Sequence, residues 1–251
     1  MRSSLTLTSI CKSFPTPRGR MAVLDSVSLN VGAGGWTSLV GPSGCGKTTL
    51  AKIASGILSA DAGRVLIGGE DAAHPAAVAY MPQHDTLFPW RSAIENAILS
   101  ADVDGRSRAE ARTEARHLFA RFGLSGFEDQ RPSTLSGGMR QRVALARTFL
   151  AHRDILVLDE PFGALDALTR AGLQRWLSDV WMELEHTVLF ITHDVEEAVL
   201  LSDRIAVSSP LPGRIRTETR VELPRPRSRV SPEVTSIRAA LMESLAEGAI
   251  S

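Results

Sequence analysis

The chain has 251 residues, with 28 lysines and arginines against 28 aspartates and glutamates, so its formal net charge is zero. Its 43% hydrophobic and 22% charged residues are typical of a globular protein and exclude a collagen-like or largely disordered chain. The balanced charge argues against nucleic acid or anionic lipid as the main partner, because proteins that bind these usually carry a basic excess.

Cysteine content and apolar runs indicate the surroundings in which the chain works. Cys11 and Cys45 are too few for a disulfide framework, which favours a reducing compartment. Residues 1–10 lack the apolar stretch of a secretory signal, and no run approaches the ~18 apolar residues of a membrane-spanning helix. If the protein works at a membrane, we expect another polypeptide to hold it there.

The first ninety residues predict strands around a glycine-rich segment. Alternating or continuous apolar runs predict strands at 5–9, 23–31, 36–40, 64–69 and 78–81. A turn-rich loop is expected at 13–20, and the glycine-rich segment after residue 40 leads into a helix that reaches Ile57.

From about Trp90 to Leu150 the sequence predicts helices. The stretches 91–100 and 107–122 are rich in Ala, Arg, Glu and Leu. A third helix begins near residue 136, and its apolar face is formed by Met139, Val143, Ala146 and Leu150. We interpret this block as a helical lobe inserted between strands.

Strands and helices alternate after the lobe. Strands are predicted at 155–158, 187–192 and 204–209. One helix is predicted at 165–184, a second between the strands at 187–192 and 204–209, and a third at 231–247. The continuous apolar runs at 155–158 and 187–192 are typical of strands buried on both faces. We therefore expect a mainly parallel α/β sheet, whose ligands bind beyond the carboxyl ends of its strands. The segment PRPRSR after Leu223 predicts an extended linker.

The segment Gly41–Thr48 matches the phosphate-binding loop, a glycine, four residues and then Gly-Lys-Ser/Thr. Its glycines let the backbone N–H groups curl around a phosphate, and the following helix offers its positive end to the anion. Lys47 can reach the β and γ phosphates, and the Thr48 hydroxyl can bind Mg²⁺. The alternative is a chance glycine-rich turn, which the strand–loop–helix order disfavours. Alkylation of Cys45 inside the loop is expected to block activity.

Two further groups of residues have chemical interest. Asp159 and Glu160 end the strand at 155–158, where one carboxylate can hold Mg²⁺ and the other can deprotonate an attacking water. The alternative is an acidic pair that caps the strand. Ser136–Gly138, at a helix start, form a second anion site that suggests a nucleotide bound to another copy; the alternative is a simple N-cap.

The string LSGGMRQ at Leu135–Gln141 resembles the signature of the ATP-binding cassette (ABC) family of ATPases. The resemblance covers roughly residues 5 to 215, and other family motifs follow in order: Gln83 as the Q-loop glutamine, Ala164–Asp166 as the D-loop and His193 as the switch histidine. It implies an α/β P-loop NTPase core with a mainly parallel sheet, N-terminal antiparallel strands and an inserted helical subdomain.

The resemblance also implies roles for single residues. Catalysis is expected from Lys47, Gln83, Glu160 and His193, and Mg²⁺ binding from Thr48, Gln83 and Asp159. The residues expected to contact ATP are Phe14, Gly41, Pro42, Ser43, Gly44, Cys45, Gly46, Lys47, Thr48, Thr49, Ser136, Gly137, Gly138, Gln141 and Asp166. In this family two copies form a head-to-tail dimer that encloses ATP and loosens after hydrolysis. Arg140 and Arg142 on the same helix are assigned no catalytic role, because arginines on helices are usually solvated.

The same resemblance divides the chain into four segments. Residues 1–90 and 152–215 form the ATP-binding core, 91–151 the helical signature subdomain, and 216–251 a C-terminal linker and helix. The segment His84–Trp90 and the helical lobe are expected to receive a cytoplasmic helix of a permease, with local core packing as the alternative.

Segments such as THDVEEAVLLSDRIAV are similar to importers of the nitrate, sulfonate and taurine group. This similarity implies an ATPase that drives uptake of a small anion, with integral membrane permease subunits, an indirect solute-binding protein and no nucleic acid. The expected location is peripheral, on the cytoplasmic face of the inner membrane. A soluble ABC ATPase, or the ATPase of an exporter or lipoprotein-extraction complex, remains an alternative.

Overall fold

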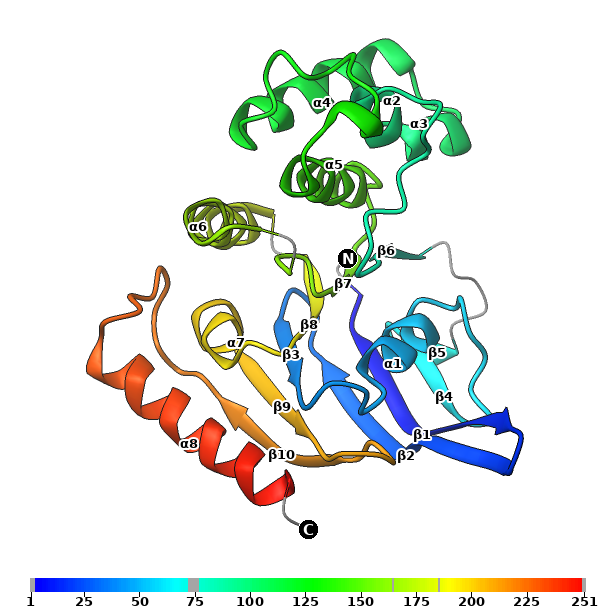
Figure 1. The fold of residues 1–251 in the computed structure, drawn as a ribbon, viewed down its shortest axis with the longest axis vertical. Coiled ribbons are helices and arrows are strands. Elements are labelled where there is room, and N and C mark those ends of the chain that lie inside the picture. The colour runs from blue at the N-terminus through cyan, green and yellow to red at the C-terminus, as the bar shows by residue number, and fades with distance from the viewer. Residues whose placement is uncertain (1–2, 72–76, 164, 185, 250–251) are drawn as a thin grey trace.

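Two β-sheets face each other across helix α1 (Lys47–Ala54) in the computed structural model, which describes residues 3–71, 77–163, 165–184 and 186–249 (Figure 1). The helix ends three residues before the predicted Ile57. Gly56 adopts a left-handed conformation (φ 70°) just beyond its end, and this conformation stops the helix.

The first sheet is antiparallel, with the strand order β2-β1-β4-β5. Its strands are β1 (Leu5–Thr16), β2 (Gly19–Val31), β4 (Ala62–Ile67) and β5 (Glu70–Asp71). The loop predicted at 13–20 is wrong, because β1 and β2 stay paired up to Thr16 and Gly19. Asp61 explains the extension, since its carboxylate accepts hydrogen bonds of 2.8 Å from the Ser13 N–H and from Lys12 and so ties the end of β1 to the start of β4.

The second sheet contains the predicted parallel strands, in the order β10-β9-β3-β8-β7-β6. They are β3 (Trp36–Val40), β6 (Val78–Met81), β7 (Ile155–Asp159), β8 (Thr187–Thr192), β9 (Arg204–Ser208) and β10 (Ile215–Arg220). All neighbours are parallel except β9 and β10. The predicted fold class is confirmed. Strand β10 was not predicted, because its sequence IRTETR has one apolar residue and its side chains are mostly exposed.

Strand β7 shows why a continuous apolar run marks a central strand. Ile155 and Val157 face α1 and the first sheet, whereas Leu156 and Leu158 belong to the core shared with the helices on the other side. All four side chains are at most 1% exposed. Successive residues of a strand point to opposite faces, so a strand covered on both faces needs apolar residues throughout.

The chain between β6 and β7 forms a helical lobe, which lies above the sheets in Figure 1. Its helices are α2 (Ala93–Ala97), α3 (Leu99–Asp104), α4 (Arg108–Arg121) and α5 (Gly137–Phe149). The single helix predicted over 91–100 is therefore wrong. A capping box of Ser92 and Glu95 starts α2, and the non-helical backbone of Ile98 (ψ 13°) separates α2 from α3.

Three helices complete the other side of the second sheet: α6 (Ala167–Leu184), α7 (Val195–Leu201) and α8 (Pro232–Ala249). The linker between β10 and α8 is held in place by two arginines. Arg225 donates to the Leu201 carbonyl, and Arg227 donates to those of Val199 and Ser202. They satisfy carbonyls that the end of α7 leaves free. Within the described part of the chain, no helix is long and apolar enough to cross a membrane.

Candidate nucleotide site

The carboxyl ends of four neighbouring strands bring the predicted catalytic residues to one edge of the second sheet. The phosphate-binding loop follows β3, His193 follows β8, Glu160 follows β7, and Gln83 lies two residues after β6. Because β3, β8, β7 and β6 are parallel neighbours, these positions meet although they are far apart in the sequence.

The loop Gly41–Lys47 needs glycine at defined positions. Gly44 and Gly46 have φ values of 81° and 102°, a region that other residues rarely adopt. A Cβ on Gly46 would also lie 2.8 Å from Cδ2 of Leu24 and 3.0 Å from the carbonyl oxygen of Val23. The loop therefore curls tightly against strand β2, as a backbone cradle for phosphate requires.

Lys47 is buried in this loop, with 7% of its surface exposed. Its Nζ donates hydrogen bonds of 2.8 and 2.9 Å to the carbonyl oxygens of Gly41 and Pro42. A buried ammonium is costly unless it is hydrogen-bonded, and a phosphate oxygen is a stronger acceptor than a carbonyl. The Lys47 ammonium can therefore replace its hydrogen bonds to these two carbonyls with hydrogen bonds to a bound phosphate.

Gln83, Glu160 and His193 form a polar cluster at the strand ends. The Gln83 amide donates to Oε2 of Glu160 at 3.0 Å, and Nδ1 of His193 lies 3.3 Å from Oε1. Glu160 has a φ of 49°, which costs a non-glycine residue about 1–3 kcal/mol and is found most often at functional sites. Its N–H donates to the Ile191 carbonyl at 2.8 Å, which holds this backbone conformation.

Asp159 is fully buried beside this cluster. Burial raises the pKa of its carboxyl group, and the neighbouring hydroxyl groups of Thr48 and Tyr80 act in the opposite direction. Among the described residues Oδ1 has no hydrogen-bond partner, whereas Oδ2 accepts from the Tyr80 hydroxyl at 3.2 Å. An orphaned carboxylate oxygen next to a threonine hydroxyl fits Mg²⁺, which proteins bind through one or two oxygen ligands together with substrate phosphates. Gln83, the third predicted metal ligand, bonds to Glu160 in this structure.

The predicted second anion site lies apart from the first, at the start of α5 in the helical lobe (Figure 1). Ser136 is the N-cap residue, and its hydroxyl accepts a hydrogen bond of 3.2 Å from the Met139 N–H. Ser136 itself is exposed. Gln141, also predicted to bind nucleotide, is 3% exposed, so its side chain lies inside the lobe.

Two other predicted nucleotide contacts have their partners outside the polar cluster. Phe14 is half-buried on β1, with Nζ of Lys12 5.7 Å from its ring centre. Asp166 caps α6 by accepting from the Leu168 and Thr169 N–H groups. Hydrogen bonds from Thr169 hold the pKa of Asp166 below its usual value. Ala164, the first D-loop residue, lies outside the described residues.

The Q-loop is tied to the signature helix by contacts that the sequence analysis missed. Arg140 forms an ion pair of 2.9 Å with Asp85, and Arg147 donates to the backbone carbonyls of Asp85 and Thr86. Arg142 donates to the Phe122 carbonyl at 2.6 Å. Arg140 and Arg142 are therefore held by protein partners and not by solvent alone. The only signal was their place on a predicted helix, which does not reveal a partner distant in the sequence.

Comparison with known proteins agrees with this geometry. The model of the family described as "ABC transporter" matches residues 24–163. The chain belongs to the ABC transporter family. Like other ABC ATPases, it binds and hydrolyses ATP. Tyr80, which the sequence analysis also missed, contacts the buried Asp159 of this ATPase.

Relatives of this ABC ATPase match nearly its whole length. It is 42% identical over 233 residues to the aliphatic sulfonates import ATP-binding protein SsuB of Bacillus licheniformis, covering 92% of this chain and 90% of the relative. It is 43% identical to a putative ATP-binding protein of Brucella abortus, covering 88% and 86%.

A solved structure has the same fold. It is a dimeric, post-hydrolysis state of the ATP-binding cassette MJ0796 bound to ADP and Pi. It superposes with a TM-score of 0.80 at 27% identity, covering 87% of this chain and 99% of the other.

Proposed function

We propose that this chain is the ATPase subunit of an importer for a small anion, with a sulfonate as the favoured solute. The observation that carries the mechanism is the meeting of Gln83, Glu160 and His193 beside the phosphate-binding loop. The direction of transport and the class of solute rest on the relatives named as aliphatic sulfonate import proteins.

The proposed mechanism assigns one task to each group. Backbone N–H groups of Ser43–Thr49 and the ammonium of Lys47 bind the β and γ phosphates. Glu160 accepts a proton from the attacking water, Gln83 orients the carboxylate, and His193 stabilises charge on the γ phosphate. Thr48 and Asp159 would hold Mg²⁺, which neutralises charge on the phosphates when it is bound.

We further propose a head-to-tail homodimer. The exposed Ser136 hydroxyl and the first N–H groups of α5 of one copy would contact the γ phosphate on the other copy, because they form an anion site on a separate part of the subunit. The structural relative MJ0796 is a dimer bound to ADP and Pi, which supports this arrangement. Loss of the γ phosphate would remove that contact and loosen the pair.

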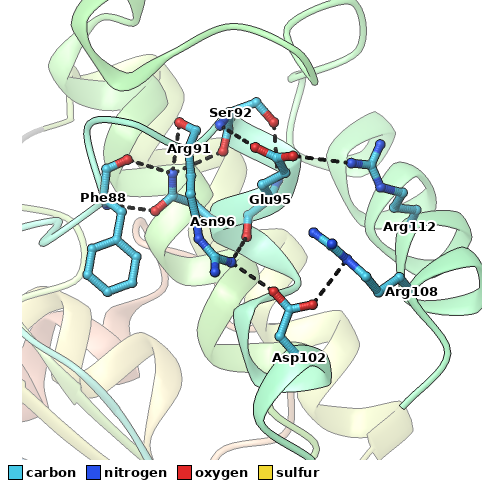
Figure 2. A network of polar contacts seen from close by, with 8 residues as sticks. All are labelled: Phe88, Arg91, Ser92, Glu95, Asn96, Asp102, Arg108 and Arg112. Atoms are coloured by element: carbon cyan, nitrogen blue, oxygen red, sulfur yellow. Dashed lines mark hydrogen bonds and ion pairs between the residues drawn. The ribbon is translucent and has the colours of Figure 1, made fainter. Parts of the chain in front are cut away.

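The helical lobe offers a surface for permease subunits that would hold the protein at the cytoplasmic face of the membrane. Trp90 is 68% exposed and stacks on Phe88 with ring centres 5.1 Å apart. Asn96, which is fully buried, holds the turn that includes Phe88 (Figure 2). Its amide oxygen accepts from the Phe88 N–H, and its amide nitrogen donates to the carbonyls of Phe88, Arg91 and Ser92. An exposed tryptophan that stacks on a half-buried phenylalanine, on a turn held by hydrogen bonds, is suited to receive a helix.

Growth of a strain that encodes the protein tests the proposal. We expect deletion of the gene to abolish growth on an alkanesulfonate as sole sulfur source while growth on sulfate is unchanged. The wild-type gene should restore growth, and the gene for Glu160→Gln should not. The contrary result is normal growth of the deletion strain on alkanesulfonate and taurine as sulfur sources and on nitrate as a nitrogen source. That result would refute the proposal that the protein drives import of an anion of this group.

A second candidate, a soluble ABC ATPase, predicts a different partner. An importer subunit should co-purify with an integral membrane protein from detergent-solubilised membranes. Recovery of the tagged protein solely from the soluble fraction would favour the soluble ATPase.

A further inference from the structure

A buried carboxylate that the mechanism above does not use lies behind the switch histidine. Glu197, on α7, is 5% exposed. Its Oε2 accepts a hydrogen bond of 2.6 Å from the Thr192 hydroxyl, and its Oε1 accepts one of 3.1 Å from the Gln174 amide. Nε of Arg170 lies 4.0 Å from Oε1. Both carboxylate oxygens are therefore occupied by groups from β8 and α6.

Burying this group is unfavourable for folding, since a carboxylate loses its hydration on burial. The effect is visible in its acidity, because burial raises the pKa of Glu197 to about 7. The charged and titratable groups that face it are Asp194 and His193 from the loop before α7 and Arg170 from α6. An uncharged residue of similar size would avoid this loss of hydration. The burial of Glu197 therefore points to a function that requires a carboxylate at this position.

Thr192 connects Glu197 to the turn that carries His193. The Thr192 hydroxyl donates its one hydrogen to Glu197, and the same oxygen accepts a hydrogen bond of 3.0 Å from the Asp194 N–H. These two bonds span His193, the residue between them. The side chain of His193 is 59% exposed. Packing therefore constrains the imidazole little, and its position depends on the backbone turn.

The other side of the carboxylate belongs to the helix that begins at the D-loop. Arg170 lies in the first turn of α6, where its N–H donates to the Asp166 carbonyl and its Nη2 donates to the Leu165 carbonyl at 3.1 Å. Two hydrogen bonds, Arg170 to the Leu165 carbonyl and Thr192 to Glu197, are thus connected by a longer ion pair of 4.0 Å between Arg170 and Glu197.

We propose that Glu197 is a positioning residue that couples the Leu165–Asp166 segment to the turn of the switch histidine, so that displacement of one moves the other. This inference rests on the proposed role of His193 in ATP hydrolysis. Glu197 does not touch the reacting atoms. Glu197 accepts the hydrogen of the Thr192 hydroxyl and so leaves the hydroxyl oxygen free to accept from the Asp194 N–H, the bond that holds the turn.

Steady-state ATP hydrolysis by the purified protein tests this coupling. Glu197→Leu removes the acceptor for the Thr192 hydroxyl, and we expect kcat to fall about 10-fold while KM for ATP stays within about 2-fold, because the phosphate-binding loop is untouched. Glu197→Gln keeps a carbonyl that can accept from Thr192 and should retain kcat within about 3-fold. If Glu197 had a mainly structural role, Glu197→Leu and Glu197→Gln would not differ in kcat while KM for ATP stays the same.

Thr192→Val preserves side-chain volume and breaks the same link from the other end. It should reproduce the loss seen in Glu197→Leu, and the double variant should lose no more than either single variant. Glu196→Gln is the matched control: it removes a neighbouring carboxylate of α7 that pairs with Arg229 and Arg238, and kcat should be unchanged. If Glu197→Leu does not fold, Thr192→Val and Glu197→Gln still carry the test.

Additive losses in the double variant, a normal kcat in Thr192→Val, or equal losses in the Leu and Gln variants would overturn the coupling. His193→Ala, measured in parallel, separates this failure from that of the proposed function. If His193→Ala keeps a normal kcat, the role of the histidine is wrong. If His193→Ala is inactive and Thr192→Val is normal, only the coupling is wrong.

Discussion

The side-chain amide of Gln83 donates a hydrogen bond of 3.0 Å to Oε2 of Glu160, across the gap between the ends of β6 and β7. The other oxygen, Oε1, lies 3.3 Å from Nδ1 of His193. An ionised carboxylate has about four acceptor positions, so two neighbours leave room for the hydrogen of a water. The carboxylate is thus oriented from both sides and still able to act as a base.

Glu160→Gln should bind ATP and fail to hydrolyse it. The amide keeps the size of the side chain and one acceptor oxygen, and it cannot take up a proton from water at neutral pH. We expect hydrolysis to fall at least ~100-fold, in line with the loss of a general base, and ATP with Mg²⁺ to trap a dimer visible by size-exclusion chromatography. A variant that hydrolyses ATP at the normal rate would refute the role of Glu160. Lys47→Ala, which should also lose ATP binding, is the control for trapping.

Gly46→Ala should destabilise the protein more than Gly44→Ala. Both residues have positive φ, but only Gly46 has neighbours in the way, since a Cβ at this position would lie 2.8 Å from Leu24 and 3.0 Å from Val23. We expect a loss of about 1 kcal/mol in the free energy of unfolding for Gly44→Ala and about 2–3 kcal/mol for Gly46→Ala. Urea unfolding followed by circular dichroism measures the difference. Equal losses would contradict the close approach of the loop to β2.

The contrast between local and distant signals explains what the sequence could predict. The phosphate-binding loop, Asp159 with Glu160, and His193 each follow an apolar run, so their meeting at one sheet edge follows from parallel strand order alone. Strand β10 has no such run. It pairs with β9 through its backbone while its side chains remain mostly exposed, so the hydrophobic pattern contains no trace of it.

Contacts between distant segments were equally hidden. The ion pair of Asp85 and Arg140 joins a loop to a helix 55 residues away, and each residue alone is typical of a solvated surface. The same holds for Glu197, whose carboxylate meets Gln174 from another helix. The sequence shows where charged residues occur along the chain. Which of them lie together depends on how α5, α6 and α7 pack.

Cys45 should react slowly with thiol reagents. The sequence alone predicts that alkylation of this residue blocks activity, but its side chain is only 1% exposed beneath the loop. A maleimide should therefore label the half-buried Cys11 first and Cys45 only when the loop opens. Mass spectrometry of timed samples gives both rates, and ATP should slow Cys45 alone. Cys45→Ala provides the control for Cys11, and rapid labelling of Cys45 in the native protein would contradict the burial.

Trp90→Ala should weaken binding to the permease and leave ATP hydrolysis by the isolated subunit unchanged. The side chain is 68% exposed and stacks on Phe88, so its removal leaves no cavity in the lobe. Co-purification with the membrane subunits measures the loss, which we expect to be about 10-fold or more in affinity. Phe127→Ala, which removes a 40% exposed aromatic elsewhere in the lobe, is the matched control. Equal binding by both variants would place the permease elsewhere.

Glu197 should contribute stability at acid pH that is lost as pH rises from about 5 to 7. The pKa of its carboxyl group is raised from 4.5 to about 7 by burial, so the folded state binds more protons than the unfolded state in this window. Stability from this group is full below pH 4.5 and is lost as pH rises through about 7, a contribution on the order of 3 kcal/mol. Glu197→Gln should flatten the curve by that amount in urea unfolding, whereas Glu196→Gln should not. A pH slope unchanged in Glu197→Gln would mean that the carboxylate remains hydrated in solution.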